Sequence, residues 1–199
     1  MIKANHGIPK ATVLKLAAIS EGLLLGLACG WSLLAGLTFN TSISLPLALF
    51  GAVASLPIFI FNFGVFVVLA ERWPCYSNYS AFKRGLVDPL CVNLDVPSAF
   101  FVALSSGIVE ELFFRGVLDS QLSELLGMPL GIAASAAIFS YVHFVGVLRS
   151  YTRLALLYFM FGLYFSYLVI LSHSLIPAML AHSIYNFSVM IYIRYFERK

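Results

Sequence analysis

Six apolar segments, each about as long as a membrane-spanning helix, dominate this sequence. A helix needs about 20 mainly apolar residues to cross the hydrocarbon core of a bilayer. The segments run approximately over residues 11–39, 45–70, 97–118, 129–148, 154–171 and 174–195. The chain is 61% hydrophobic and 11% charged, whereas soluble domains are about half apolar and a quarter charged. We therefore expect residues 1–199 to form a single all-α, polytopic membrane helical bundle.

The positions of Lys and Arg orient these segments. In short loops, these residues are retained on the cytoplasmic side of the membrane. With the N-terminus inside, the following residues all fall inside: Lys3, Lys10, Arg72, Lys83, Arg84, Arg149, Arg153, Arg194, Arg198 and Lys199. Lys15 is near enough to a helix end for its side chain to reach the cytoplasmic surface. Arg115 is the one basic residue that this orientation does not place at that surface. The expected outer connections, residues 40–44, 120–128 and 172–174, contain no Lys or Arg. Both termini are thus predicted to be cytoplasmic.

Charge and cysteine content exclude several other classes of protein. The net charge of +3 is small and the basic residues are scattered, so no nucleic-acid partner is expected. Cys75 and Cys91 fall in a predicted inner loop and Cys29 in a helix, and none has metal-ligand spacing. The size and the lack of organelle signals favour the inner (plasma) membrane of a prokaryote, although an endoplasmic reticulum protein would have the same charge bias.

Only one connection, residues 71–96, is long enough to have structure of its own. It mixes aromatic residues with acidic and basic ones, a composition that suits either a stretch lying on the inner membrane surface or an ordinary surface loop. Pro97 fits the first turn of a helix, and Asp95 or Ser98 could cap that helix.

Ionisable side chains inside the apolar segments are the strongest indication of function. Each costs about 2.5–3.5 kcal/mol on insertion scales and persists mainly where it faces a cavity or a partner. Glu110 and Glu111 lie in the third segment, His143 in the fourth, and His182 with Asn186 in the sixth. Glu21, Asp119 and Glu124 are interpreted as structural or surface residues, with Glu21 the most exceptional of them.

Helical spacing predicts which of these groups share a face. Residues four apart lie on one face, so Glu111 is expected beside Arg115, and His182 beside Asn186. Glu110 is turned by about 100° from Glu111, so one of the two is expected to face substrate while the other is held in place. Counting about 1.5 Å per residue puts Glu110 and His182 at similar depth. The same count puts His143 closer to the inner surface.

A carboxylate and an imidazole together can activate water, and nearby His and Asn side chains can stabilise an oxyanion. Structural roles compete with this interpretation. Arg115 with the two glutamates could be a buried ion pair, His143 a packed histidine, and His182 with Asn186 a helix-to-helix hydrogen-bonding pair.

Three motifs, in order, resemble a known family. Residues 110–116 (EELFFRG) match E-E-x-x-x-R, residues 139–143 (FSYVH) match F-x-x-x-H, and residues 182–186 (HSIYN) match H-x-x-x-N. Together they resemble the CPBP family of intramembrane proteases, which includes CAAX prenyl endopeptidases and bacteriocin-processing and immunity proteins. The resemblance covers residues 97–187 as a catalytic core. Residues 1–96, with the first two helices and the inner loop, are not covered.

This resemblance implies peptide-bond hydrolysis within the membrane. It implies that Glu110 and His143 activate water, that His182 and Asn186 form an oxyanion hole, and that Glu111 and Arg115 support the site. A catalytic zinc held by the two histidines and a glutamate is the alternative, although no H-E-x-x-H motif is present. We favour the glutamic mechanism without a metal or other cofactor.

Three functions therefore compete. The first is an endopeptidase that hydrolyses a peptide bond near the terminus of a membrane-anchored or lipidated protein or peptide. The second is a non-catalytic immunity or scaffold protein of the same fold. The third is a small proton-coupled carrier, since Glu and His also form proton relays. Intact water-activating residues favour the first function over the second, and the lack of an internal repeat favours it over the third.

Overall fold

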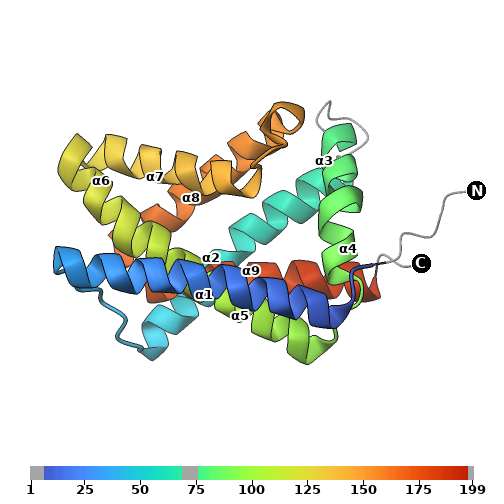
Figure 1. Ribbon diagram of the computed structural model, residues 1–199, viewed down its shortest axis with the longest axis horizontal. Helices are drawn as coiled ribbons and strands as arrows, with labels where there is room; N and C mark the ends of the chain where they lie inside the picture. Colours follow the sequence, from blue (N-terminus) through green and yellow to red (C-terminus); the bar gives the residue numbers. More distant parts are fainter. Residues whose placement is uncertain (1–6, 69–75, 197–199) are drawn as a thin grey trace, which may run out of the picture.

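The computed structural model describes residues 7–68 and 76–196, and these residues form helices and no strands. The predicted all-α helical bundle is confirmed (Figure 1). In chain order the elements are α1 (Lys10–Ala35), α2 (Leu45–Ile60), η1 (Phe61–Val68), α3 (Tyr76–Phe82), η3 (Lys83–Val87), α4 (Asp88–Cys91), α5 (Val96–Glu111), η4 (Leu112–Leu118), α6 (Asp119–Leu126), α7 (Met128–His143), η5 (Leu148–Ser150), α8 (Thr152–Ser172) and α9 (Ile176–Tyr195).

Within the described residues, each of the six apolar segments is mainly helical, but the helices differ in length. Among the described residues, five helical stretches are long and apolar enough to cross a membrane, and α7, with 16 residues, is shorter. The exact number of spans and the cytoplasmic location of the termini remain predictions. Lys3, Arg72, Cys75, Arg198 and Lys199, on which parts of those predictions rest, lie outside the described residues.

The third helix is longer than expected. Residues 120–128 were expected to connect two spans outside the membrane, but α5, η4 and α6 form one helical stretch as far as Leu126. Residues 119–126 contain neither Gly nor Pro, so nothing interrupts the helix before Gly127, which has a φ of 80°. α7 then packs closely on α6, because a Cβ on Gly131 would come within 2.3 Å of the Ser123 backbone nitrogen.

α7 also ends earlier than the sequence predicted. It was expected to reach residue 148, but its last residue is His143. Phe144 is fully buried, and the chain then turns through Gly146, which has a φ of 80°. His143 therefore lies at a helix end, where its ring meets the interior of the bundle.

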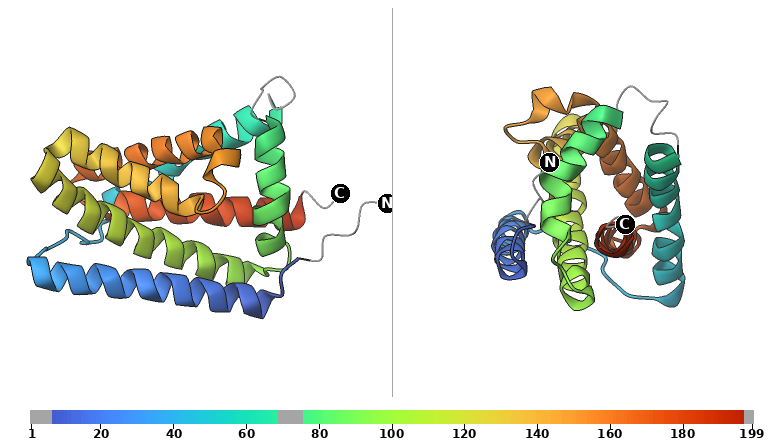
Figure 2. Two further views of the ribbon diagram at one scale, coloured as in Figure 1. Left: turned by 45° about the horizontal axis from the view of Figure 1, so that its top comes forward. Right: turned by 90° about the vertical axis from the view of Figure 1, so that its right-hand side faces the viewer.

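α9 is the central helix of the bundle and lies between α2 and α5 (Figure 2). Both contacts depend on small residues. A Cβ on Gly51 of α2 would lie 2.9 Å from Pro177 of α9, and one on Gly107 of α5 would lie 2.7 Å from the Ser183 backbone nitrogen. Small residues let helix backbones approach closely, and the resulting van der Waals packing is one of the forces that hold helices together in lipid. α1 lies outside α5 (Figure 2).

The start of α1, the end of α9 and the helices of the 71–96 connection meet at one end of the bundle (Figure 1). Hydrogen bonds join them: the Arg194 side chain donates to the carbonyl of Val92, and the Asn93 amide donates to that of Ile8 at 3.0 Å. From residue 76 onward the connection is therefore a folded part of the bundle, since residues 76–91 are helical. Of its two cysteines, Cys91 is described and is free, and burial raises the pKa of its thiol to about 12.

Asp95 is the N-cap of α5, one of the two caps that the sequence offered. Its carboxylate accepts hydrogen bonds from the Ser98 backbone N–H at 3.0 Å and from the Lys10 ammonium group at 2.9 Å. These bonds lower the pKa of Asp95 well below its usual range, with the contact to Ser98 as the largest cause. The cap thus also ties the start of α1 to the start of α5.

We predict that Asp95→Ala lowers the melting temperature of the detergent-solubilised protein at pH 7, and that Asp95→Asn, which can still cap, lowers it less. Because the folded-state pKa is depressed, the contribution of the charge is fully present above the unfolded pKa of about 3.9, and it is lost progressively as pH falls from there through the lower folded-state pKa. Thermal unfolding between pH 7 and pH 3 should therefore show the difference between the wild type and Asp95→Asn beginning to shrink at the acidic end. A constant difference over that range would contradict the assignment.

Candidate active site

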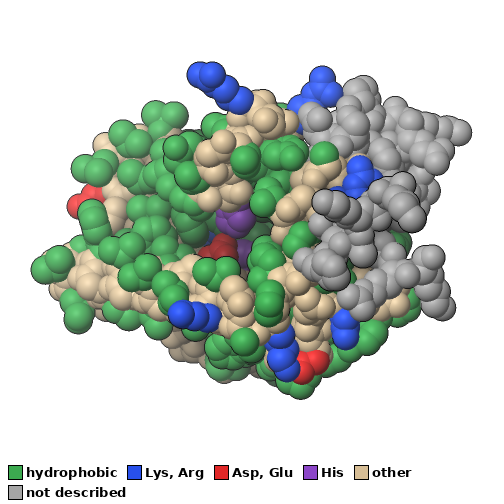
Figure 3. All heavy atoms as spheres, turned by 45° about the vertical axis from the view of Figure 1, so that its right-hand side comes forward, with side chains coloured by type: hydrophobic (Ala, Val, Ile, Leu, Met, Phe, Trp, Pro, Cys, Tyr) green, Lys and Arg blue, Asp and Glu red, His purple; other side chains and the backbone are tan. Residues whose placement is uncertain are grey.

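The polar residues of three apolar segments meet inside the bundle. Glu110 and Glu111 end α5, His143 ends α7, and His182 and Asn186 lie on α9. Figure 3 shows a hollow in the apolar surface, with acidic and histidine side chains at its base. The convergence that the sequence predicted is therefore present in the structure, and the two glutamates take different partners.

Glu111 is the buried centre of this arrangement. Its side chain is 0% exposed, and one of its oxygens, Oε1, lies 2.7 Å from Nδ1 of His182. Arg115 approaches both oxygens, with Nη1 at 3.3 Å from Oε1 and Nε at 3.2 Å from Oε2. The predicted pairing of Glu111 with Arg115 is confirmed. An uncompensated carboxylate would be very costly at this depth, so these two partners are what allow it to remain there.

Arg115, the basic residue that falls within a predicted span instead of an inner loop, has polar and aromatic contacts in addition to Glu111. Its Nη2 donates to the carbonyl of Gly162 in α8 at 3.0 Å. Its guanidinium group lies 4.4 Å from the ring centre of Phe139 and 5.3 Å from that of Phe165. Cation–π contacts of this kind are strongest where water is excluded, and the Arg115 side chain is only 1% exposed.

Glu110 pairs with His143 and is the more accessible glutamate. Its Oε2 lies 3.7 Å from His143 Nε2, and the two side chains are 15% and 27% exposed. The His143 Nδ1 lies 2.7 Å from the Phe139 carbonyl. Since a carbonyl can only accept, Nδ1 carries a proton and Nε2 faces Glu110. A separation of 3.7 Å is too long for a direct hydrogen bond.

The sequence placed His143 nearer the inner surface than Glu110, and this estimate was wrong. The helical hairpin turns at Gly127, near the end of the expected connection over residues 120–128, because the third helix continues to Leu126. Glu110 precedes Leu126 by 16 residues and His143 follows Met128 by 15 residues, so the two arms of the hairpin have nearly equal length. The longer third helix therefore brings both side chains to the same level.

Asn186 is held by a residue that the sequence analysis did not select. Its Nδ2 donates to Oγ of Ser106 at 3.0 Å. Ser106 lies four residues before Glu110 on α5, so both side chains occupy one helix face. That spacing would have identified Ser106 from the sequence. Asn186 therefore lies on the Glu110 side of the site.

Three further residues lie close to the site. The Tyr158 ring packs against His143 with ring centres 4.9 Å apart. Asp119, one turn beyond Arg115, is close to Ser135 and Ser166. Glu21 on α1 has a buried Oε2 with no hydrogen-bond partner among the described residues, and it lies within electrostatic range of Glu110 and His182. Asp119 and Glu21 are thus more closely connected to the site than the sequence indicated, whereas Glu124 is exposed.

The zinc alternative does not fit this donor set. Within the described parts of the chain, no three His, Cys, Asp or Glu side chains are grouped so that they could hold a metal ion. His182 directs Nδ1 to Glu111 and His143 directs Nδ1 to a backbone carbonyl. Glu110 and Glu111 each lie beside a different histidine.

We predict that Arg115→Met destabilises the protein by about 3–5 kcal/mol, because it leaves the buried Glu111 carboxylate without its main counter-ion. The double variant Arg115→Met/Glu111→Leu should recover a substantial part of this loss. Unfolding by SDS in mixed micelles would measure both changes. Arg149→Met, at an exposed position, is the control and should have little effect. Additive losses in the double variant would contradict the pairing.

Comparison with known families agrees with the motifs. Residues 92–188 match the model of the family described as type II CAAX prenyl endopeptidase Rce1-like. No curated protein and no solved structure matches the chain. All of the candidate residues, Glu110, Glu111, Arg115, His143, His182 and Asn186, lie inside the matched range. Helices α1, α2 and α3 lie outside it.

Proposed function

Because residues 92–188 belong to the Rce1-like type II CAAX prenyl endopeptidase family, we propose that this protein is an intramembrane endopeptidase in which Glu110 and His143 activate water. One observation carries the proposal: Oε2 of Glu110, which has no hydrogen-bond partner among the described residues, faces Nε2 of His143 across 3.7 Å, while the Nδ1 of the same ring contacts a backbone carbonyl. Two acceptors at this separation suit the two O–H groups of one water molecule.

The chemical step uses these two acceptors in order. The water donates one hydrogen to Glu110 and the other to His143, so that an oxygen lone pair is directed at the carbonyl carbon of the substrate. Glu110 removes a proton as the C–O bond forms. The protonated carboxyl then gives that proton to the leaving amine as the C–N bond breaks. The products are a carboxylic acid and an amine, and the base is regenerated.

Asn186 and His182 are the proposed oxyanion donors. Asn186 uses one amide hydrogen on Ser106 and has a second for the developing negative charge. The Nδ1–H of His182 is directed at Glu111, so the ring donates through Nε2 only when both nitrogens are protonated. The Glu111 carboxylate compensates the positive charge of that form. Glu111 and Arg115 therefore act as positioning residues.

Family membership supports a membrane-anchored or lipidated protein or peptide as the substrate. The buried position of the site within a bundle of apolar helices agrees with cleavage at a bond close to the membrane. We propose that this multi-pass membrane protein lies in the plasma membrane of a prokaryote.

We predict that Glu110→Gln lowers kcat by at least about 10²-fold, since the amide cannot accept the proton from water. His143→Ala should be similarly impaired. The assay is cleavage of a panel of peptides and membrane-protein tails by the purified protein, with and without a strong chelator. Glu124→Gln, an exposed glutamate on α6, is the matched control and should retain full activity.

Each alternative gives a distinct result in the same assay. Activity that is lost with the chelator and restored by zinc would overturn the glutamic mechanism. No cleavage by the wild type, with equal binding of a partner by wild type and Glu110→Gln, would favour the immunity or scaffold function. Uptake of protons into liposomes without any cleavage would favour a carrier.

We also predict that Asn186→Ala lowers kcat by about 10²-fold with a much smaller change in KM, because an oxyanion donor acts mainly in the transition state. Ser106→Ala should lower kcat less, and the double variant should be no worse than Asn186→Ala alone. Ser105→Ala is the control, because this neighbouring hydroxyl donates to the carbonyl of Val102. Independent effects of the two substitutions would contradict the positioning role of Ser106.

A further inference from the structure

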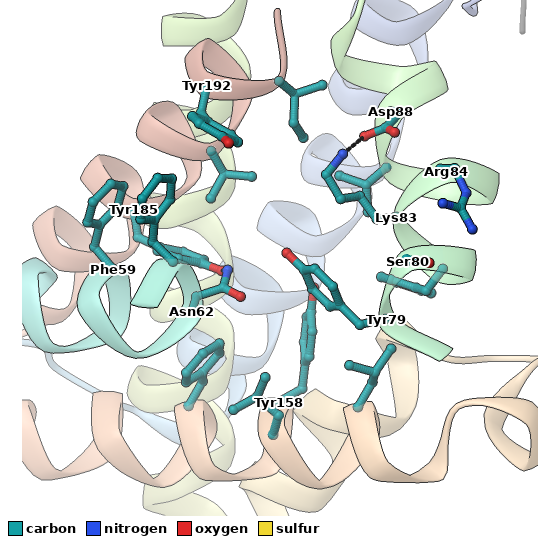
Figure 4. Close-up of a pocket in the computed structure, with 18 residues that line it drawn as sticks. Phe59, Asn62, Tyr79, Ser80, Lys83, Arg84, Asp88, Tyr158, Tyr185 and Tyr192 are labelled. Atoms are coloured by element: carbon teal, nitrogen blue, oxygen red, sulfur yellow. Dashed lines mark hydrogen bonds and ion pairs between the residues drawn. The ribbon is translucent and has the colours of Figure 1, made fainter. Parts of the chain in front are cut away.

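A cavity of about 390 Å³ lies beside the active site, between η1, α3, η3, α8 and α9 (Figure 4). Eight of its 18 lining residues are aromatic and five are aliphatic, so an occupant must be mainly apolar. The volume is within the usual range for ligand pockets, about 300–1,000 Å³. Its polar residues include an ion pair in which Lys83 Nζ lies 2.7 Å from Asp88 Oδ1.

One aromatic ring is shared by the cavity and the active site. Tyr158 lines the cavity and also packs against His143, with ring centres 4.9 Å apart. An extended peptide advances about 3.3 Å per residue. A chain that runs from the Glu110–His143 pair therefore passes the Tyr158 ring within about two or three residues. The cavity is thus within reach of side chains close to the cleaved bond.

The side-chain amide of Asn62, in the wall of the cavity, indicates what kind of ligand the cavity binds. Asn62 uses its Nδ2 to contact the Tyr185 hydroxyl. Its Oδ1 is buried and has no hydrogen-bond partner among the described residues. In Figure 4, Asn62, Tyr79 and Tyr158 point into the same space from three different elements. A buried amide oxygen without a donor is costly, and a peptide N–H would satisfy it, whereas a hydrocarbon chain would not.

We infer that this cavity is a specificity subsite that binds an apolar residue of the peptide substrate two or three positions from the cleaved bond, with the backbone N–H of that residue donated to Asn62. The inference rests on the proposed peptidase function. It also assigns a role to a part of the chain outside the family match, since Phe59, Asn62 and Tyr79 all precede residue 92. The subsite therefore depends on residues that the family match does not cover.

The test uses a photo-cross-linking peptide and the Glu110→Gln variant, which is expected to bind without cleavage. The probe is a Gly/Ser-rich decapeptide with one benzoylphenylalanine, used in two forms, with and without N-methylation at that residue. Cross-linked residues are identified by mass spectrometry. Leu157→Trp, which fills the cavity, is compared with Leu156→Trp at the adjacent position, which is 62% exposed. Asn62→Leu removes the proposed acceptor.

We expect cross-links to residues of α8, α9 and η1 that line the cavity, a loss of at least tenfold in Leu157→Trp, and no loss in Leu156→Trp. N-methylation should weaken labelling about five- to tenfold in the Glu110→Gln background. It should have no further effect once Asn62 is also replaced by leucine. Labelling outside the cavity, or equal labelling in the two tryptophan variants, would overturn the subsite. An equal effect of N-methylation with and without Asn62 would overturn the hydrogen bond.

Cleavage by the wild type separates the two proposals. If substrates are cleaved but the probe labels other positions, the subsite is wrong and the peptidase function stands. If the cavity is labelled as expected but no peptide is cleaved, the chain has a peptide-binding cavity and the catalytic proposal fails.

Discussion

The buried carboxylate of Glu111 is the interaction on which the rest of the site depends. It joins three parts of the bundle, because it binds Arg115 on its own helical stretch and His182 on α9, and Arg115 in turn binds the Gly162 carbonyl of α8. Charges at this depth are stable only in such a closed network. Because Arg115 and His182 both bind Glu111, the neighbouring Glu110 has His143 as its partner.

The small residues of the helices make that network possible. Gly107 lets α5 touch α9 at Ser183, so that Ser106, Asn186, Glu111 and His182 come within hydrogen-bonding distance of one another as two pairs. Hydrogen bonds are directional and short, and a Cβ at Gly107 would separate the helices that carry them. The contact between α5 and α9 therefore determines both the helix packing and the hydrogen bonds of the site.

The site also shows why an apolar bundle contains a cavity beside its polar centre. Aromatic rings of α8 pack against both histidines: Phe165 stacks on His182, and Tyr158, which also lines the cavity, packs on His143. Large planar side chains keep water from the ion pairs while leaving apolar space beside them. Tyr158 therefore contacts both a histidine of the site and the cavity in which we propose that a substrate side chain binds.

The sequence by itself determined the helical class, the approximate segments and the candidate residues, because hydropathy and residue spacing are local properties. The pairing of Glu111 with Arg115 followed from the same spacing. The level of His143 did not, since it depended on where the hairpin turns, and that is fixed by Gly127 and the packing of Gly131 on α6. The partners of Glu110, His182 and Asn186 lie on different helices. Only tertiary packing decides such contacts, because no rule of spacing relates residues on separate helices.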